Sequence, residues 1–357
     1  MTQHQHRTRN VTVRLAGVAI SGMLSAATVL RRPRPPGGAA GDLIALTVAQ
    51  RRVVARDQDV VELTLTAAHG GALPRWHPGS HIDVHLPSGR IRQYSLCGDP
   101  GSREGYRIAV RRIPDGGGGS IEVHDLAVGA VVHTHGPRNA FPLTVPGYGS
   151  PTRRLRFVAG GIGITPILPM LRYARQLGID WSMVYAGRSA DSLPYLDEVG
   201  TLGDSVVVRT DDRHGIPDAE ELLGDCTAAT AVYACGPAPM LTAIRAALVG
   251  RDDVELHFER FAAAPVVDGH PFDVIVGSTG QTVTVGADET LLAALRRSAV
   301  TPPYSCQQGF CGTCRTQVLA GDVDHRDTLL SEPERAAGQI LTCVSRAAAD
   351  STLTLDL

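Results

Sequence analysis

Four cysteines in the last sixth of the chain have a spacing that can hold an iron–sulfur cluster. Cys306, Cys311 and Cys314 form a C-x4-C-x2-C pattern, and Cys343 follows at a distance. This is the plant-type spacing of a [2Fe–2S] cluster, whose irons are held by four thiolates. Two glycines inside the loop let the backbone fold tightly and direct amide groups at the sulfurs. Structural zinc, which usually takes two C-x2–4-C pairs, and disulfides are the alternatives, and both fit this spacing less well.

Two glycine-rich segments can bind phosphate groups. A run of four glycines ends at Gly118 and Gly119 and is followed by Ser120. The turn therefore exposes consecutive amides at a predicted helix start, where Ser120 can cap the helix or bind an anion. A flexible hairpin loop is the alternative there. The turn at residues 160–163, Gly-Gly-Ile-Gly, joins a predicted strand to a helix, a place that favours a pyrophosphate. It departs from the G-x-G-x-x-G fingerprint, so alone it is a weak signal.

The cysteine loop also carries a family resemblance. Together with the segments Asp324–Asp327 (DHRD) and Leu341–Ala347 (LTCVSRA), it resembles the C-terminal ferredoxin domain of the phthalate dioxygenase reductase and vanillate demethylase reductase family. The resemblance extends over about residues 43–357. It implies a flavin module, a nicotinamide module and an iron–sulfur module in that order, with the four cysteines as cluster ligands.

The flavin signature of that family resembles the segment Arg92–Pro100 (RQYSLCGDP). On a strand, Arg92 and Tyr94 face one side, and Gln93 and Ser95 face the other. An arginine suits a phosphate, the Tyr94 ring suits a flavin face, and the Ser95 hydroxyl or a backbone amide suits flavin N5. The Asp-Pro ending favours FMN over FAD within the family. The remaining residues that we assign to the flavin site are Val110, Arg111, Gly118, Gly119 and Ser120.

The resemblance implies that two turns of the second module flank the nicotinamide. They contribute Gly161, Gly163 and Thr165 from the first turn and Cys235, Gly236 and Pro237 from the second. Thr165 is also expected near the flavin and Cys235 near the hydride path, so Ser95, Thr165 and Cys235 are the predicted catalytic residues. For Cys235 taken alone, a buried core thiol is the plainer interpretation.

The choice between NADH and NADPH depends on two neighbouring strand ends. Arg188 can grip a 2′-phosphate, whereas Asp211 and Asp212 would oppose it and favour a free ribose. Because the family mostly uses NADH, we expect NADH, with NADPH as the alternative. Phe261, at the end of the module, is expected to shield the flavin.

The elements that must position these residues change character along the chain. Short alternating segments predict a small antiparallel barrel and include Ile82–Leu86, Ile91–Leu96, Tyr106–Val110 and Val131–Thr134. Buried strands alternating with helices predict a doubly wound parallel sheet and include Leu155–Ala159, Pro166–Gln176 (helix), Trp181–Ala186, Val206–Arg209 and Ala231–Ala234. A hairpin and a helix precede the cysteine loop, at Phe272–Val276, Thr282–Val285 and Thr290–Ala299.

The expected fold is therefore multidomain. It comprises a leader (1–42), an FMN-binding β-barrel domain (43–149), an α/β NAD(P)-binding domain (150–262), a linker (263–271) and an α+β, β-grasp ferredoxin domain (272–357).

Composition limits the possible partners. The 357 residues are 43% hydrophobic and 20% charged, which excludes wholesale disorder and a polytopic membrane protein. The net charge of −2 implies no nucleic-acid partner, and the absence of lysine, which makes all 34 basic residues arginine, gains no functional meaning. Residues 1–41 carry six arginines and no acid, and the apolar run Leu15–Leu30 is too short to span a bilayer. It predicts a leader helix that packs on the body or is loosely ordered, in a cytoplasmic protein. Weak membrane or partner contact through residues 1–40 is the alternative.

The resulting hypothesis is an NAD(P)H-dependent reductase that passes electrons through FMN and the [2Fe–2S] cluster to a terminal Rieske-type oxygenase, a demethylase or ring-hydroxylating dioxygenase. The cofactors carry the redox chemistry, and the protein supplies geometry and electrostatics. A haem-thiolate monooxygenase is the alternative partner. A non-catalytic redox sensor is the rival of a different class.

Overall fold

The computed structural model describes residues 43–114, 117–144, 152–263 and 265–357, and Leu43–Leu357 form one compact unit. The predicted leader lies outside the described residues. No helix within the described ranges is long and apolar enough to cross a membrane.

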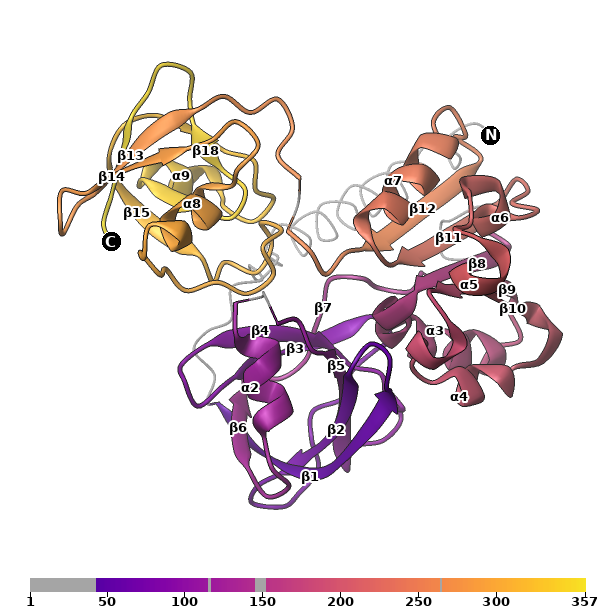
Figure 1. Cartoon of the computed structure of the whole chain (residues 1–357). Helices are drawn as coiled ribbons and strands as arrows, with labels where there is room; N and C mark the ends of the chain where they lie inside the picture. The colour runs from indigo at the N-terminus through magenta and orange to yellow at the C-terminus, as the bar shows by residue number, and fades with distance from the viewer. Residues whose placement is uncertain (1–42, 115–116, 145–151, 264) are drawn as a thin grey trace, which may run out of the picture. The chain divides into compact units, whose positions relative to one another are not determined.

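The first module is the predicted antiparallel barrel (Figure 1). Its described elements are β1 (Ile44–Ala55), β2 (Val60–Ala67), β3 (Ser80–His85), β4 (Ile91–Ser95), β5 (Gly105–Arg111), α2 (Gly119–Asp125), β6 (Val131–Thr134) and β7 (Arg138–Asn139). The strands follow the order β4-β3-β6-β1-β2-β5, and β7 pairs with β3. The Cys97 amide donates to the Arg107 carbonyl at 2.9 Å, which ties the end of β4 to β5 and closes the barrel. Alternate residues of the strands fill its interior, among them Leu46, Leu63, Ile82, Leu96 and Ile108.

The second module is the predicted parallel sheet with helices on both faces (Figure 1). Its strands are β8 (Arg154–Gly160), β9 (Asp180–Gly187), β10 (Val206–Thr210), β11 (Thr230–Cys235) and β12 (Val254–Glu259), in the order β10-β9-β8-β11-β12. Helix α3 (Ile164–Gln176) packs on one face of the sheet. Helices α6 (Ala219–Leu223) and α7 (Ala238–Ala247) pack on the other, while α4 (Leu196–Gly200) and α5 (Asp211–His214) are short. This is a doubly wound arrangement, in which ligands bind at the carboxyl ends of the strands.

The barrel and the parallel sheet share one hydrophobic core. Val60, Cys97 and Phe141 of the barrel pack in the same cluster as Phe157 and Tyr233 of the sheet. A buried polar network reinforces this junction around Glu62, whose carboxylate accepts from Arg52 at 2.6 Å and from the Tyr195 hydroxyl at 2.7 Å, and lies 3.2 Å from Arg107. The two modules therefore meet through apolar packing and through the buried Glu62 carboxylate of the barrel, which accepts from Tyr195 of the second module.

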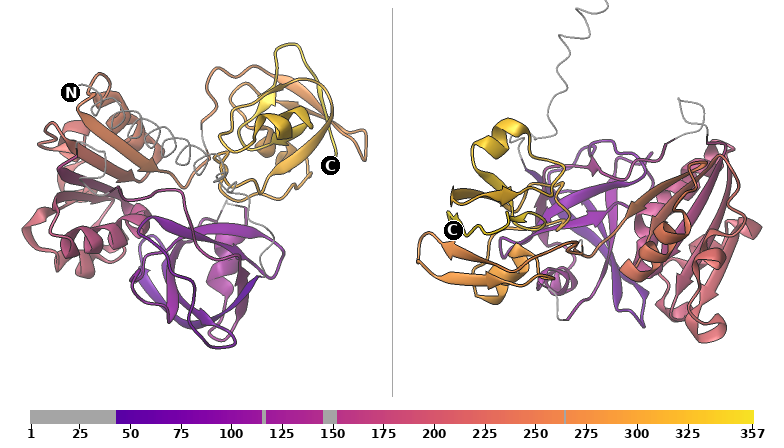
Figure 2. Two further views of the ribbon diagram at one scale, coloured as in Figure 1. Left: turned by 180° about the vertical axis from the view of Figure 1, so that it is seen from behind. Right: turned by 90° about the horizontal axis from the view of Figure 1, so that it is seen from above.

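The third module has a mixed sheet crossed by one helix (Figures 1 and 2). Its elements are β13 (Phe272–Val276), β14 (Thr282–Val285), α8 (Leu291–Arg297), β15 (Arg315–Ala320), β16 (Val323–Asp324), α9 (Glu332–Ala336), β17 (Gln339–Leu341), β18 (Arg346–Ala347) and β19 (Leu353–Leu355). The sheet runs β14-β13-β19-β15-β17, with β13 parallel to β19, and β16 pairs with β18. Arg346 is buried and donates to the carbonyls of Gly286, Glu289 and His270, so it fixes the chain entering this module.

Element ends differ from the sequence expectation at the helices. Helix α3 begins at Ile164, two residues before the predicted Pro166, because a proline in the first turn needs no N–H donor. Helix α8 is shorter at both ends than predicted. The Thr290 hydroxyl accepts from the Ala293 amide at 3.1 Å and is the N-cap, and Ala299, beyond the last turn, has φ 62°, which is incompatible with a continuing helix.

Candidate functional site

The four cysteines of the predicted cluster site lie together. All are free thiols, and Cys306, Cys314 and Cys343 are buried. Hydrogen bonds, first from Cys311 and then from Cys343, lower the pKa of Cys306 well below its usual range, and a hydrogen bond from Cys343 lowers that of Cys314. The sulfurs therefore form one contiguous group.

Among the described residues, no set of three or more His, Cys, Asp or Glu side chains surrounds a position for one ion. A [2Fe–2S] cluster places two thiolates on each of two irons, so its ligands need not converge on one point. The sequence spacing of these cysteines, C-x4-C-x2-C with a distant fourth, is the plant-type pattern of such a cluster.

The backbone of the cysteine loop also fits a cluster. Gly309 and Gly312 have φ values of 81° and 78°, in the left-handed region that favours glycine. The Gln308 amide donates to the Cys306 sulfur at 3.3 Å, and the Thr313 amide donates to the Cys311 sulfur at 3.5 Å. Amides directed at sulfur stabilise the charge of a bound anionic cluster.

Strand β4 presents the predicted flavin residues on two faces. Gln93 pairs with Asp83 of β3 and Ser95 with His81, so these four side chains share a face. Tyr94 lies on the opposite face and packs against the barrel core. The side-chain nitrogen of Gln93 is buried and has no hydrogen-bond partner among the described residues. A buried donor without a partner fits a ligand rich in carbonyl acceptors, such as a flavin ring.

Arg92 extends from β4 to the glycine turn. Its guanidinium donates to the Gly117 carbonyl at 2.9 Å, and a Cβ placed on Gly119 would lie 2.5 Å from its Nε. The same guanidinium donates to the Tyr304 hydroxyl at 2.6 Å. The arginine and the glycines predicted to hold the flavin phosphate are therefore brought together, and the cysteine module adds Tyr304, which sequence patterns did not single out.

Three of the predicted flavin residues are used differently. The Ser120 hydroxyl does not cap α2, whose N-cap is Gly118 with φ 76°, and it instead accepts from the Ile113 amide at 3.0 Å. Ser120 therefore closes the loop that precedes α2. The Val110 side chain lies in the barrel core, and Arg111, at the end of β5, is exposed. The structure does not bring Val110 to the Arg92 group.

The loop carrying Cys306 lies against β3. The Ser305 hydroxyl donates to the Asp83 carboxylate at 3.5 Å, and the Phe310 ring lies 6.3 Å from the His81 ring. Burial, then Arg138, lowers the pKa of His81 to about 4, so this histidine is neutral near pH 7. The face of the barrel that carries Gln93 and Ser95 is thus the face that the cluster loop covers.

The two turns predicted to flank the nicotinamide cross closely at the carboxyl edge of the sheet. A Cβ on Gly163 would lie 2.1 Å from the Cys235 carbonyl oxygen, and one on Gly236 would lie 2.2 Å from Met240. Gly161 has φ 53° and open space where its Cβ would be. Close approach at Gly163 beside an open glycine at Gly161 fits a pyrophosphate lying on the turn. Thr165 is buried, and its hydroxyl donates to the Ile162 carbonyl at 3.0 Å.

A buried carboxylate accompanies Cys235. Glu259 ends β12 in register with Cys235 at the end of β11. Burial raises the pKa of Glu259 to about 8, and one of its carboxylate oxygens has no hydrogen-bond partner in the described part of the chain. Burial, then Glu259, raises the pKa of the Cys235 thiol. Sequence reasoning assigned no role to Glu259, because neither its burial nor its proximity to Cys235 is visible in a local pattern.

The predicted specificity residues lie at neighbouring strand ends. The Asp212 amide donates to the Arg188 carbonyl at 3.0 Å, so Arg188 and Asp211 are near one another where β9 and β10 end. Phe261 follows β12 and is 46% exposed. The adjacent Arg260 carbonyl accepts a hydrogen bond from Gln308 of the cluster loop, so the end of the second module also contacts that loop.

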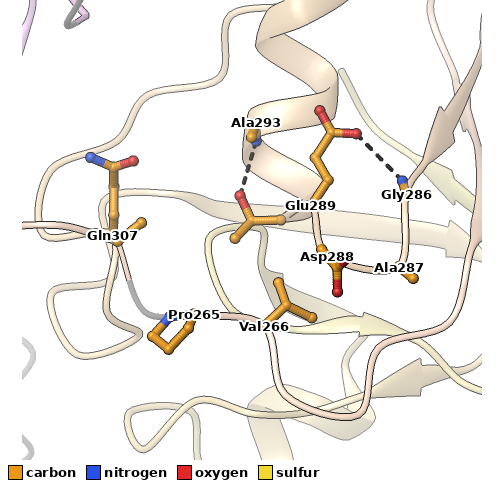
Figure 3. A pocket seen from close by; sticks show the side chains of 10 residues that line it. Pro265, Val266, Gly286, Ala287, Asp288, Glu289, Ala293 and Gln307 are labelled. Carbon is orange, nitrogen blue, oxygen red and sulfur yellow. Dashed lines mark hydrogen bonds between the residues drawn. The ribbon is translucent and has the colours of Figure 1, made fainter. Parts of the chain in front are cut away.

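A pocket of about 640 Å³ lies beside the cluster loop, whose Gln307 is one of its lining residues (Figure 3). It is bounded by Pro265 and Val266 of the predicted linker and by the start of α8. Glu289 accepts from the Gly286 amide at 3.4 Å, and Thr290 caps α8, so these polar side chains are occupied by backbone groups. None of the predicted site residues lines this pocket.

Comparisons with known proteins agree with this geometry. The family model described as a 2Fe-2S iron-sulfur cluster binding domain matches residues 274–348, which contain all four clustered cysteines. Phenoxybenzoate dioxygenase subunit beta of Ectopseudomonas oleovorans is 41% identical over 304 residues, or 84% of this chain and 93% of that protein. Vanillate O-demethylase oxidoreductase of a Pseudomonas strain is 39% identical over 326 residues, or 88% of this chain and 100% of that protein. The structure of phthalate dioxygenase reductase is similar with a TM-score of 0.63 and 34% identity, over 88% of this chain and 98% of that one.

The chain belongs to the phthalate dioxygenase reductase family. This reductase is a flavin- and iron–sulfur-dependent NAD(P)H oxidoreductase, and the cofactors of its family are FMN, NADH and a [2Fe–2S] cluster. It is also similar to an intact type IV self-sufficient cytochrome P450 monooxygenase, at 40% identity and a TM-score of 0.65. That match covers 92% of the reductase but 43% of the monooxygenase chain, so the reductase spans less than half of that protein.

Proposed function

We propose that this reductase takes electrons from NADH and delivers them to a separate terminal oxygenase of the Rieske type. When bound, FMN accepts two electrons as a hydride and passes them on singly, and the [2Fe–2S] cluster carries one electron. The chain's own residues bind and orient these groups. NADPH is the alternative donor, because Arg188 lies beside Asp211 and the two favour opposite nucleotides.

Several of the predicted site residues have a role in this proposal. Gln93 and Ser95 would hydrogen-bond the flavin ring from one face of β4, whereas Tyr94 packs against the barrel core on the opposite face. Thr165 and Cys235 bound the nicotinamide, and Phe261 shields the flavin. The four clustered cysteines hold the irons.

One observation carries the proposal. Segments of the cluster loop, Tyr304 to Phe310, contact Arg92, Asp83 and His81 of the barrel. The flavin strand and the cysteine loop are therefore adjacent within one chain, and the barrel also shares its core with the nucleotide module. Such an arrangement supports electron transfer inside a single molecule.

An anaerobic titration tests the proposal. NADH added to the purified protein should bleach the flavin absorbance and produce the electron paramagnetic resonance signal of a reduced [2Fe–2S] cluster. When the protein is mixed with a Rieske oxygenase whose gene lies near its own, it should support turnover of the substrate of that oxygenase. A preparation without flavin, or a flavin that NADH does not bleach, contradicts the proposal.

A haem-thiolate monooxygenase is the second candidate partner, favoured by the similarity to the self-sufficient cytochrome P450. The two candidates are separated by measuring reduction of each purified terminal component by the reductase and NADH. Faster reduction of the Rieske component supports the first candidate, and faster reduction of the haem-thiolate component supports the second.

A further inference from the structure

Three guanidinium groups gather around the glycine turn of the barrel, and one of them comes from the ferredoxin module. A Cβ on Gly117 would lie 2.9 Å from Arg296 Nη2 and 3.0 Å from Arg92 Nη2, and one on Gly118 would lie 3.5 Å from Arg90. Arg90 and Arg92 flank the start of β4, whereas Arg296 lies in α8. Two distant parts of the chain thus direct positive charge at the same backbone.

Tyr304 lies between two of these arginines. Its ring centroid is 4.1 Å from the Arg92 guanidinium carbon and 4.6 Å from that of Arg296. Its hydroxyl accepts from Arg92 at 2.6 Å, and it is also the atom closest to the Cβ position of Gly117. The tyrosine therefore holds both guanidinium groups at the turn.

In the described part of the chain, one of these three guanidinium groups has a carboxylate partner. Arg90 has an ion pair with Glu122 at 3.4 Å, but neither Arg92 nor Arg296 has a carboxylate partner among the described residues. Burial lowers the pKa of Arg92; Tyr304 and Tyr94 oppose this effect, whereas the nearby charges of Arg296 and Arg90 add to it. Like charges held together in a partly buried place repel one another, so an anion at this place would stabilise the arrangement.

We propose that Arg296 and Tyr304 of the ferredoxin module complete the binding site for the terminal phosphate of FMN. This inference rests on the proposed function, since it requires a bound flavin. A phosphomonoester carries between one and two negative charges near pH 7, and guanidinium groups bind it in a forked geometry. Arg92 holds the phosphate from the barrel and Arg296 holds it from α8. The phosphate therefore also joins the two modules.

The test compares flavins with and without the phosphate. The holoenzyme is diluted, and the fluorescence of released FMN gives its dissociation constant. The same measurement is repeated after the FMN is exchanged for riboflavin. Arg296→Ala should raise the FMN dissociation constant about tenfold or more and leave that of riboflavin unchanged.

Arg297→Ala is the matched control. Arg297 is the neighbouring arginine of α8, is 59% exposed and is paired with Glu289 at 3.0 Å, so its removal changes the net charge equally. It should leave both dissociation constants at the wild-type values. If Arg296→Ala folds poorly, Arg296→Lys keeps the charge and should give a smaller loss of FMN affinity.

The outcomes separate this inference from the function. If the wild-type protein binds FMN, and Arg296→Ala and Arg296→Lys have the same FMN dissociation constant as Arg297→Ala, the inference is wrong and the proposed function stands. Equal weakening of FMN and riboflavin also overturns it, because Arg296 then does not act on the phosphate. Wild-type protein that binds no FMN overturns both.

Discussion

The guanidinium carbon of Arg92 lies 4.1 Å from the centre of the Tyr304 ring, although the two residues are 212 positions apart in the sequence. Arg92 belongs to the strand that carries the flavin signature, and Tyr304 stands two residues before the first cluster cysteine. A cation over an aromatic ring contributes about 0.5–2 kcal/mol. The contact therefore docks the cysteine loop on the flavin strand.

Tyr304→Ala should slow electron transfer from flavin to cluster without slowing flavin reduction. The variant loses both the ring contact and the hydroxyl that accepts from Arg92. Anaerobic stopped-flow absorbance, with excess FMN present to keep the site filled, separates flavin bleaching from cluster reduction. We expect a several-fold lower cluster rate. An unchanged cluster rate would show that the docking does not depend on this contact.

Replacing any clustered cysteine should remove the [2Fe–2S] cluster and spare the flavin. Cys343→Ser takes away one of four thiolates that must act together. Iron content and the visible spectrum measure the loss, and FMN content should stay near one per chain. Cys226→Ser is the control, because Cys226 is half-buried and remote from the cysteine loop. Loss of iron in the Cys226 variant would contradict the ligand assignment.

Glu62→Gln should destabilise the junction between the barrel and the parallel sheet. The buried Glu62 carboxylate is the shared partner of Arg52, Arg107 and Tyr195. Removing the charge of a buried group that several partly exposed partners share costs about 1–3 kcal/mol. Urea unfolding followed by circular dichroism measures the change. Glu332→Gln, which breaks an exposed pair with Arg335, should have little effect, and equal losses in both variants would refute the role of burial.

The pH dependence of stability should carry a contribution from Glu259. Its pKa is raised to about 8 by burial, from the usual value of 4.5. Between those values the folded state holds a proton that the unfolded state has lost, so stability falls as the pH rises from about 4.5 through 8. Glu259→Gln removes this titration, and the decline of the unfolding midpoint over that interval should flatten. Glu220→Gln, at an exposed position in the same module, should keep the wild-type slope.

Local patterns in the sequence predicted the strands well. The hairpin strands at Phe272–Val276 and Thr282–Val285 and the strand Val131–Thr134 have the predicted bounds. The alternation of apolar and polar residues in these strands involves only neighbours in the sequence, so it can be recognised without the fold. Strands β1 and β12 were not bounded in advance, because their exposed and half-buried stretches interrupt the alternation.

The candidate site was predictable only where its residues are close in the sequence. The spacing of the clustered cysteines and the glycines at 160–163 was visible in this way. The contact of Tyr304 with Arg92 and that of Ser305 with Asp83 join separate modules, and no local pattern reveals them. At Ser120 a local pattern was visible, but the contact that it suggested does not form. Its position favoured a helix cap, but its hydroxyl binds the Ile113 backbone across the loop.

The central claim is that one chain carries electrons from NADH through the flavin to the cluster. A rapid-freeze experiment tests it most directly, in which one equivalent of NADH is mixed anaerobically with the holoenzyme at several protein concentrations. The account predicts a reduced-cluster signal that follows flavin bleaching with a rate independent of protein concentration. A cluster that stays oxidised, or a rate proportional to protein concentration, would contradict it.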